Sequence, residues 1–220
     1  MDVTLDHPGQ EITSDAAWVA RAQAGELAAF EALATRYERR VYSLAWRILR
    51  QEQDAEDVTQ QTFLSVLEHL ADFRAQSSFA TWIMRVATHA ALKILRRRKG
   101  LAAAAWAPAV DPRDEDGPIP HPEFIADWRE SPAILVVRHE SRELIETALA
   151  RLDEKYRLVF LLRDVEGLSV RETAETLGIG EDNVKVRLLR ARLQLREWLT
   201  RAFGNPARQL QAPHRPEPLI

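Results

Sequence analysis

A chain of 220 residues with 46% apolar residues and a net charge of −3 can build one large or two small folded cores, but it is not a globally basic nucleic-acid coat. It has no cysteine and its six histidines are scattered without ligand spacing, so we expect neither disulfides nor a metal site nor a cofactor. No apolar run approaches transmembrane length and the acidic N-terminus is unlike a signal peptide, which predicts a cytoplasmic protein without membrane insertion.

The first predicted block is helical from Asp15 to about Lys99, after an N-terminus of residues 1–14 that we expect to be disordered. Neither glycine nor proline interrupts residues 26–99, and apolar residues repeat at helical spacing in three segments. This pattern predicts a compact all-helical domain, with Asp54 and Ser78 as N-caps of the second and third helices. The apolar positions are Phe30, Leu33, Tyr37, Val41, Leu44 and Ile48, then Val58, Phe63, Val66, Leu67 and Leu70, then Phe79, Trp82, Ile83, Val86, Ala90 and Leu95.

The middle of the chain, residues 100–135, has a different composition. It contains six prolines, and its seven acidic residues face only two arginines, which leaves a local charge of −5. Such a segment is a linker. It is either a solubilising tether, which composition alone favours, or an acidic ribbon that lies in a basic channel of a partner.

Helical pattern resumes over residues 136–203 and contains a helix-turn-helix motif. Ala174 is small enough for two helices to approach, Gly178 can adopt the left-handed conformation of a tight turn, and Val184 returns an apolar contact. Leu177 and Ile179 fill the space between the two helices. A helix beneath the motif is expected to pack through Leu144, Leu149, Leu152, Val159, Phe160 and Leu162. The proline-rich tail, residues 204–220, is expected to be disordered.

The second helix of the motif has three kinds of surface on a helical wheel. Its inward face consists of Val184, Leu188, Ala191, Leu195 and Trp198, and its two basic flanks consist of Lys185, Arg192 and Arg196, and of Arg187 and Arg190. Between the flanks lie Val186, Leu189 and Leu193, which we expect to face outward. This apolar strip could contact thymine methyls while arginines hold phosphates, or it could be covered by a protein partner. A helical hairpin that binds nothing would explain the charges but not the strip.

Both helical blocks resemble a known family. The segments AFEALATRYERRVYSLAWRIL, DAEDVTQQTFLSVLEHL and FATWIMRVATHAALKILRRR are similar to region two of the bacterial sigma-70 family. The segment ALARLDEKYRLVFLLRDVEGLSVRETAETLGIGEDNVKVRLLRARLQLRE is similar to region four. The two regions occur in the family's order with no further domain between them, and in this the chain resembles the extracytoplasmic-function (group 4) sigma factors. The resemblance implies an all-α fold of two small domains, region 2 (15–99) and region 4 (136–203), joined by an extended acidic linker.

The resemblance also implies a function. Such a protein is not an enzyme: it binds core RNA polymerase at the beta-prime clamp and the beta flap, recognises the −35 and −10 promoter elements, and assists promoter opening. An anti-sigma factor holds it inactive. The linker would thread toward the polymerase active-site cleft, which favours the second interpretation of its acidic residues.

Family motifs assign residues to three contacts. For docking on the polymerase clamp they are Asp54, Glu56, Asp57, Gln60 and Gln61. For the −10 element, which needs stacking surfaces and cations around unstacked bases, they are Ser77, Ser78, Trp82, Arg85, His89, Lys93, Arg96 and Arg97. For the −35 duplex they are Lys185, Val186, Arg187, Leu189, Arg190 and Arg192. The chain departs from common family residues at His89, Val186 and Leu189, so its base preferences are expected to differ.

Two other functions fit the residues. The first is a stand-alone helix-turn-helix repressor, which would normally be a dimer that reads half-sites. The second is an adaptor whose basic helices bind acidic proteins. Transcription with purified core polymerase distinguishes these alternatives from a sigma factor.

Overall fold

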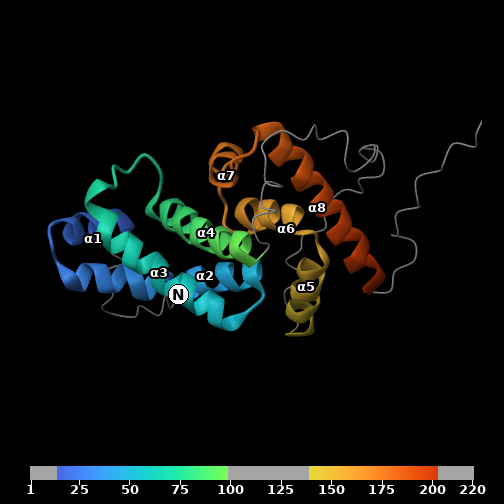
Figure 1. Cartoon of the computed structure of the whole chain (residues 1–220), viewed down its shortest axis with the longest axis horizontal. Helices are drawn as coiled ribbons and strands as arrows, with labels where there is room; N and C mark the ends of the chain where they lie inside the picture. Colours follow the sequence, from blue (N-terminus) through green and yellow to red (C-terminus); the bar gives the residue numbers. More distant parts are fainter. Residues whose placement is uncertain (1–13, 99–138, 203–220) are drawn as a thin grey trace, which may run out of the picture.

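The computed structural model describes residues 14–98 and 139–202, and within them every regular element is a helix (Figure 1). This confirms the all-α fold class predicted from the sequence. The predictions for residues 1–13, for the linker 100–135 and for the tail 204–220 lie outside the described residues. Within the described ranges, no helix combines the length and the apolar character that a membrane span requires.

The N-terminal group of helices is built around one long amphipathic helix. Helix α2 (Leu27–Leu49) packs against α1 (Asp15–Gln23), α3 (Glu52–His69) and α4 (Phe79–Arg98), and the short helix η1 (Leu70–Asp72) follows α3. Leu33, Val41 and Ile48 of α2 are at most 1% exposed, as their helical spacing predicts. The Tyr37 hydroxyl donates a hydrogen bond to Asp15 and joins α2 to α1. Burial of the ring and this carboxylate raise the pKa of Tyr37 to about 12.

The C-terminal group contains α5 (His139–Arg151), α6 (Glu154–Phe160), the π-helical turn η5 (Leu161–Val165), α7 (Val170–Leu177) and α8 (Glu181–Ala202). The single helix predicted beneath the helix-turn-helix is therefore divided into α5, α6 and η5. The division between α5 and α6 falls at Asp153, which is the N-cap of α6, and η5 follows α6 directly. Helix α8 packs against α5, α6 and α7.

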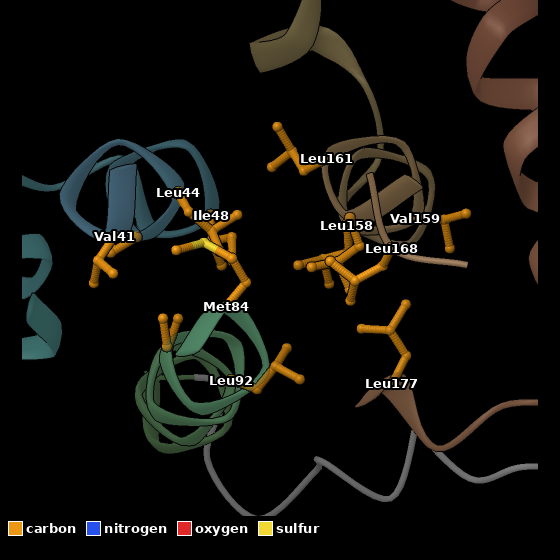
Figure 2. Close-up of a cluster of buried hydrophobic side chains, with 14 of the residues drawn as sticks. Val41, Leu44, Ile48, Met84, Leu92, Leu158, Val159, Leu161, Leu168 and Leu177 are labelled. Atoms are coloured by element: carbon orange, nitrogen blue, oxygen red, sulfur yellow. The ribbon is translucent and has the colours of Figure 1, made fainter. Parts of the chain in front are cut away.

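The two groups share one hydrophobic core. Helix α2 contacts α6, and α4 contacts α7. Figure 2 shows Ile48 and Met84 on one side of this core and Leu158, Leu168 and Leu177 on the other. Met84 and Leu158 are completely buried. The arrangement brings α4 directly against the first helix of the helix-turn-helix (Figure 1).

Candidate functional site

The first candidate surface is the exposed face of α3. Glu56, Asp57, Gln60 and Gln61 are all exposed on this helix, so four of the five residues assigned to polymerase docking form one polar edge. Asp54 is different. It is the third residue of a helix that begins at Glu52, so the prediction that it is the N-cap is wrong.

Asp54 is half-buried and forms an ion pair with Arg98 at the end of α4. Arg98 also donates a 3.0 Å hydrogen bond to the Leu49 carbonyl. These contacts connect α3, α4 and the end of α2, which gives Asp54 a structural role within the helical group.

Two leucines extend the polar edge of α3, and the sequence reasoning missed them. Leu64 is 48% exposed and Leu67 is 52% exposed, and both lie on the same face as Asp57 and Gln60. Leu67 was predicted to belong to the apolar stripe of the core, and the structure shows that this prediction is wrong. The exposure of Leu64 could have been predicted from its position on a helical wheel. There it falls next to Gln60 and Gln61 and away from Val58 and Val66. We call Asp57, Gln60, Gln61, Leu64 and Leu67 the α3 face.

The second candidate surface runs along α4. At 100° per residue, the residues assigned to the −10 element fall within one strip of the helix, apart from Ser77 in the preceding loop and Arg97 beside the strip. We call this set the α4 strip: Ser78, Trp82, Arg85, His89, Lys93 and Arg96. The strip is about 27 Å long at 1.5 Å per residue. Ser78 accepts a 3.0 Å hydrogen bond from the Thr81 backbone N–H, as predicted for a residue that caps this helix.

Trp82 lies at the edge of an aromatic cluster. Its ring is half-buried, with its centroid 4.9 Å from that of Phe73 and 5.8 Å from that of Phe79. Phe79 in turn packs edge-to-face on Tyr37 at 5.4 Å. The Trp82 ring therefore belongs partly to the core, and its remaining surface borders the strip.

The middle of the α4 strip contacts α7. Arg85 Nη1 lies 3.4 Å from Glu175 Oε2, and His89 Nε2 lies 3.1 Å from the Thr176 carbonyl, to which it donates a hydrogen bond. The His89 side chain remains largely exposed, but partial burial of its ring against α7 lowers its pKa, and Arg85 and Arg96 lower it further. Lys93, Arg96 and Arg97 are exposed beyond this contact.

The third candidate surface is the helix-turn-helix, whose predicted geometry is confirmed. Ser169 and Glu172 form a reciprocal capping box that begins α7, and Gly178 ends it with φ +68°. Val184 is completely buried, and Ala174 is 7% exposed. These contacts fix the angle at which α8 leaves the turn.

The N-terminal half of α8 carries the residues assigned to the −35 duplex. Lys185 is exposed, and its Nζ lies 2.9 Å from Asp182 Oδ1. Val186, Arg187 and Leu189 are half-buried. The apolar pair thus keeps part of its surface accessible, as the wheel predicts.

Three residues further along α8 differ from the sequence prediction. Arg190 is only 7% exposed, with Nη1 3.5 Å from the hydroxyl of Tyr156 on α6, and Leu193 is only 8% exposed, so neither faces outward here. Arg192 is exposed and donates two hydrogen bonds, of 2.8 and 2.7 Å, to Asp164 of η5. Helix α8 packs on α5 and α6 as well as on α7, and these three neighbours cover a wider arc of its surface than the single inward face that the wheel predicts.

Family models match both helical groups. Residues 33–100 match sigma-70 region 2, and residues 142–195 match sigma-70 region 4. The sequence is 30% identical to the ECF RNA polymerase sigma factor SigE of Mycolicibacterium smegmatis, covering 91% of this chain and 73% of that protein. It is also 30% identical to the RNA polymerase sigma-H factor of Pseudomonas aeruginosa, covering 79% of this chain and 88% of that protein.

Two solved structures are similar in fold. CnrH in complex with the cytosolic domain of CnrY matches with a TM-score of 0.55 and 24% identity, covering 85% of this chain and 97% of that one. The sigma factor RpoE of Bartonella quintana, in complex with the anti-sigma factor NepR, matches with a TM-score of 0.53 and 18% identity, covering 78% and 96%. At these identities the likeness shows the fold alone.

A region 2 helical group followed by a region 4 helix-turn-helix defines a sigma factor of the sigma-70 type, which is a transcription initiation factor and not an enzyme. With relatives of this identity and coverage, the chain belongs to the ECF RNA polymerase sigma factors. The resemblance predicted from the sequence is confirmed.

Proposed function

We propose that this sigma factor docks on the beta-prime clamp of core RNA polymerase through the α3 face. The face combines a carboxylate, two amides and two exposed leucines on one side of a single helix. Carboxylate and amide groups suit an arginine-bearing partner, and exposed leucines at helical spacing suit an apolar groove beside it. The pairing of exposed leucines with a polar edge is the observation that carries the proposal.

The α4 strip is proposed to bind the −10 element. Lys93, Arg96 and Arg97 supply exposed cations for phosphates, and the loop before α4 supplies the hydroxyls of Ser77 and Ser78. The accessible surface of Trp82 supplies a stacking platform at the same end of the helix. His89 stands at the middle of the strip, where an imidazole offers a different hydrogen-bonding pattern from an amide.

The first turns of α8 are proposed to read the −35 duplex. Lys185 and Arg187 flank Val186 and Leu189, so that cations for phosphates lie on either side of apolar groups suited to thymine methyls. Arg190 and Arg192 belong to the same proposal. To reach DNA, Arg190 would first have to leave Tyr156, and Arg192 would first have to leave Asp164.

Regulation and organisation complete the proposal. We assign the DNA- and polymerase-binding functions to domains 15–99 and 136–203. The acidic linker between them is proposed to thread through polymerase. The beta flap of polymerase is proposed to bind region 4. The protein acts in the cytoplasm, where its polymerase is. Because RpoE of Bartonella quintana was solved with an anti-sigma factor, we propose that such a factor also holds this chain inactive.

Run-off transcription with purified core polymerase tests the docking proposal. Leu64→Arg is expected to abolish both core binding and the promoter-specific transcript, because a buried unpaired cation is disfavoured in an apolar groove. Leu27→Arg is the matched control, since Leu27 is 63% exposed but lies on α2, and this variant should retain both activities.

Equal activity of the two variants would contradict docking through the α3 face. A wild-type chain that binds duplex DNA tightly without adding a promoter-specific transcript would favour the repressor alternative. A chain that binds neither polymerase nor DNA would favour the adaptor.

A further inference from the structure

One side chain of α1 reaches across to the segment that leads into α4. Gln23, the last residue of α1, donates from Nε2 to two backbone carbonyls, at 2.9 Å to that of Leu70 and at 3.0 Å to that of Phe73. Leu70 begins η1 and Phe73 follows it, so both acceptors lie where the chain leaves α3 for α4 (Figure 1). Because both acceptors are carbonyls, only the amide nitrogen of Gln23 can make these contacts.

These two hydrogen bonds are not what attaches α1 to the rest of the helical group. Val19 of α1 is only 6% exposed in the core, and Asp15 of α1 accepts a hydrogen bond from the hydroxyl of Tyr37. Gln23 itself is exposed, so its hydrocarbon part contributes little to the core. What its amide determines is therefore the position of the backbone that it contacts.

The loop after this backbone contains a strained residue. Ala75 has φ +54°, a left-handed conformation in which the Cβ of an L-residue crowds the following carbonyl. Such a conformation persists only where the surrounding structure determines it, and it is frequent at ligand-binding sites. Both ends of this loop are fixed. Gln23 holds Phe73 at the first end, and at the other end Ser78 accepts a 3.0 Å hydrogen bond from the Thr81 N–H.

Phe73 also connects the loop to the stacking surface of the α4 strip. Its ring centroid lies 4.9 Å from that of Trp82. Gln23 binds the carbonyl of this same phenylalanine, so one amide holds the backbone whose ring supports Trp82. Ser77 and Ser78, which we assign to −10 DNA, follow in the same loop. A loop that is already fixed loses little conformational entropy when it binds a base.

We propose that Gln23 is a positioning residue for recognition of the −10 element. Its amide fixes the backbone at Phe73, and the hydroxyls of Ser77 and Ser78 are then held in place for an unstacked base. The proposal rests on the assignment of −10 DNA to the α4 strip and to the loop before it. Gln23 precedes residue 33, where the match to sigma-70 region 2 begins, so that match assigns it no role.

Hydrogen exchange of Gln23→Met tests whether the amide positions the loop. Methionine is unbranched, uncharged and similar in length, but it cannot donate a hydrogen bond to either carbonyl. Exchange in peptides that cover residues 70–78 should be faster by about threefold or more, whereas exchange over residues 15–22 should be unchanged. Gln194→Met makes the same chemical change at an exposed position of α8 and should leave exchange in the loop as in the wild type.

The second measurement is base preference. Holoenzyme assembled from purified core polymerase and each variant selects from short single-stranded oligonucleotides of random sequence, and core polymerase alone gives the background. The wild-type chain should enrich one base at one position of the selected sequences. Gln23→Met should lower this enrichment by about threefold or more, because a looser loop discriminates less between bases. Gln194→Met should retain the full enrichment.

A donor-bearing variant separates the hydrogen bonds from the shape of the side chain. Gln23→Arg places several N–H donors on a longer side chain that can reach both carbonyls. Its charge raises the affinity for every strand alike, whereas base preference depends on the loop. Gln23→Arg should therefore retain both the slow exchange and the enrichment that Gln23→Met loses. Loss of both in Gln23→Arg would show that the hydrogen bonds are not what positions the loop, and would overturn the proposal.

Unchanged exchange in the loop of Gln23→Met would also overturn the proposal. So would faster exchange throughout α1, since it would show that the side chain holds α1 and not the loop. If the loop exchanges faster while the base preference stays as in the wild type, Gln23 positions the loop, but the assignment of −10 DNA to this loop fails. A wild-type chain that enriches no base would contradict that assignment directly.

Discussion

At the scale of single residues, Lys185 offers the clearest test of the −35 surface. Its ammonium is exposed and forms an ion pair with Asp182, which raises the pKa of Lys185 and lowers that of Asp182. If Lys185 contacts a phosphate, Lys185→Ala should reduce the slope of log affinity against log salt for −35 duplex by about one. Asp182→Asn should act in the opposite direction, because it removes a carboxylate that competes with the phosphate for the ammonium of Lys185. Fluorescence anisotropy over a salt series measures both, and parallel slopes for all three proteins would contradict a phosphate contact.

Some single-residue roles could be predicted from the sequence and others could not. Ala174, Gly178 and Val184 were predicted correctly because their contacts are local and the motif spacing fixes them. The positions of Asp54 and Arg190 depend on distant partners, Arg98 and Tyr156, which no local pattern indicates. Leu67 has the spacing of a core residue, and periodicity alone cannot distinguish a buried apolar position from one that borders an exposed face.

At the scale of elements, the turn between α7 and α8 contains two glycines with different requirements. Gly178 has φ +68°, whereas Gly180 has no positive φ, and a Cβ at either position would have no atom within 4 Å. Backbone strain therefore applies to Gly178 alone, whereas Gly180 precedes α8 and its carbonyl accepts a 3.1 Å hydrogen bond from the Val184 N–H, which makes it the N-cap of that helix. Gly178→Ala should destabilise the protein by about 1–2 kcal/mol, and Gly180→Ala should cost less, because it loses only the preference of the N-cap for glycine over alanine.

Urea unfolding measures this pair of variants, and Gly178→Asn provides a further control because asparagine tolerates the left-handed conformation better than alanine. Equal free energies of unfolding for Gly178→Ala and Gly180→Ala would contradict the role of the turn. The prediction extends to function, since a relaxed turn would change the angle of α8. The −35 affinity should therefore fall in Gly178→Ala more than in Gly180→Ala.

Helical periodicity predicted α2, α3 and α4, and the spacing of the helix-turn-helix motif predicted α7 and α8. It did not detect the division of the preceding segment into α5, α6 and η5. The signal there is weak: a capping aspartate, Asp153, and a π-turn that leaves the apolar spacing almost unchanged. The turn matters because it positions Glu166, whose carboxylate pairs with Arg40 of α2 and adds a polar contact to the apolar core that the two regions share.

At the scale of the whole molecule, the contact of α7 with α4, which we call the closed form, makes a pH dependence testable at His89. The groups that face its ring are Arg85 and Arg96 on α4, and the Thr176 carbonyl on α7, with Glu172 and Glu175 close to Arg85. Partial burial of the ring in the closed form lowers the pKa of His89 from its ordinary value of 6.5. Opening, by which we mean the separation of α7 from α4, returns the imidazole to water and removes the largest cause that lowers its pKa, whereas Arg85 and Arg96 stay beside it on α4.

The sign of the effect follows from proton binding. Above pH 6.5 the imidazole is neutral in both forms, and the closed form keeps its full stability. As the pH falls from 6.5 toward the lowered pKa, the open form binds a proton more readily than the closed form, so the equilibrium shifts toward opening. Energy transfer between dyes attached at Ala28→Cys on α2 and Gln194→Cys on α8, in this cysteine-free chain, should therefore decrease between about pH 7.5 and about pH 5.5.

His89→Asn separates this histidine from every other titrating group in the chain. Asparagine keeps an N–H that can donate to the Thr176 carbonyl, but it does not titrate, so the decrease in energy transfer should be much smaller in this variant. An unchanged pH profile would mean that other groups drive opening. If the wild-type profile is steeper, acidification separates α7 from α4 through His89.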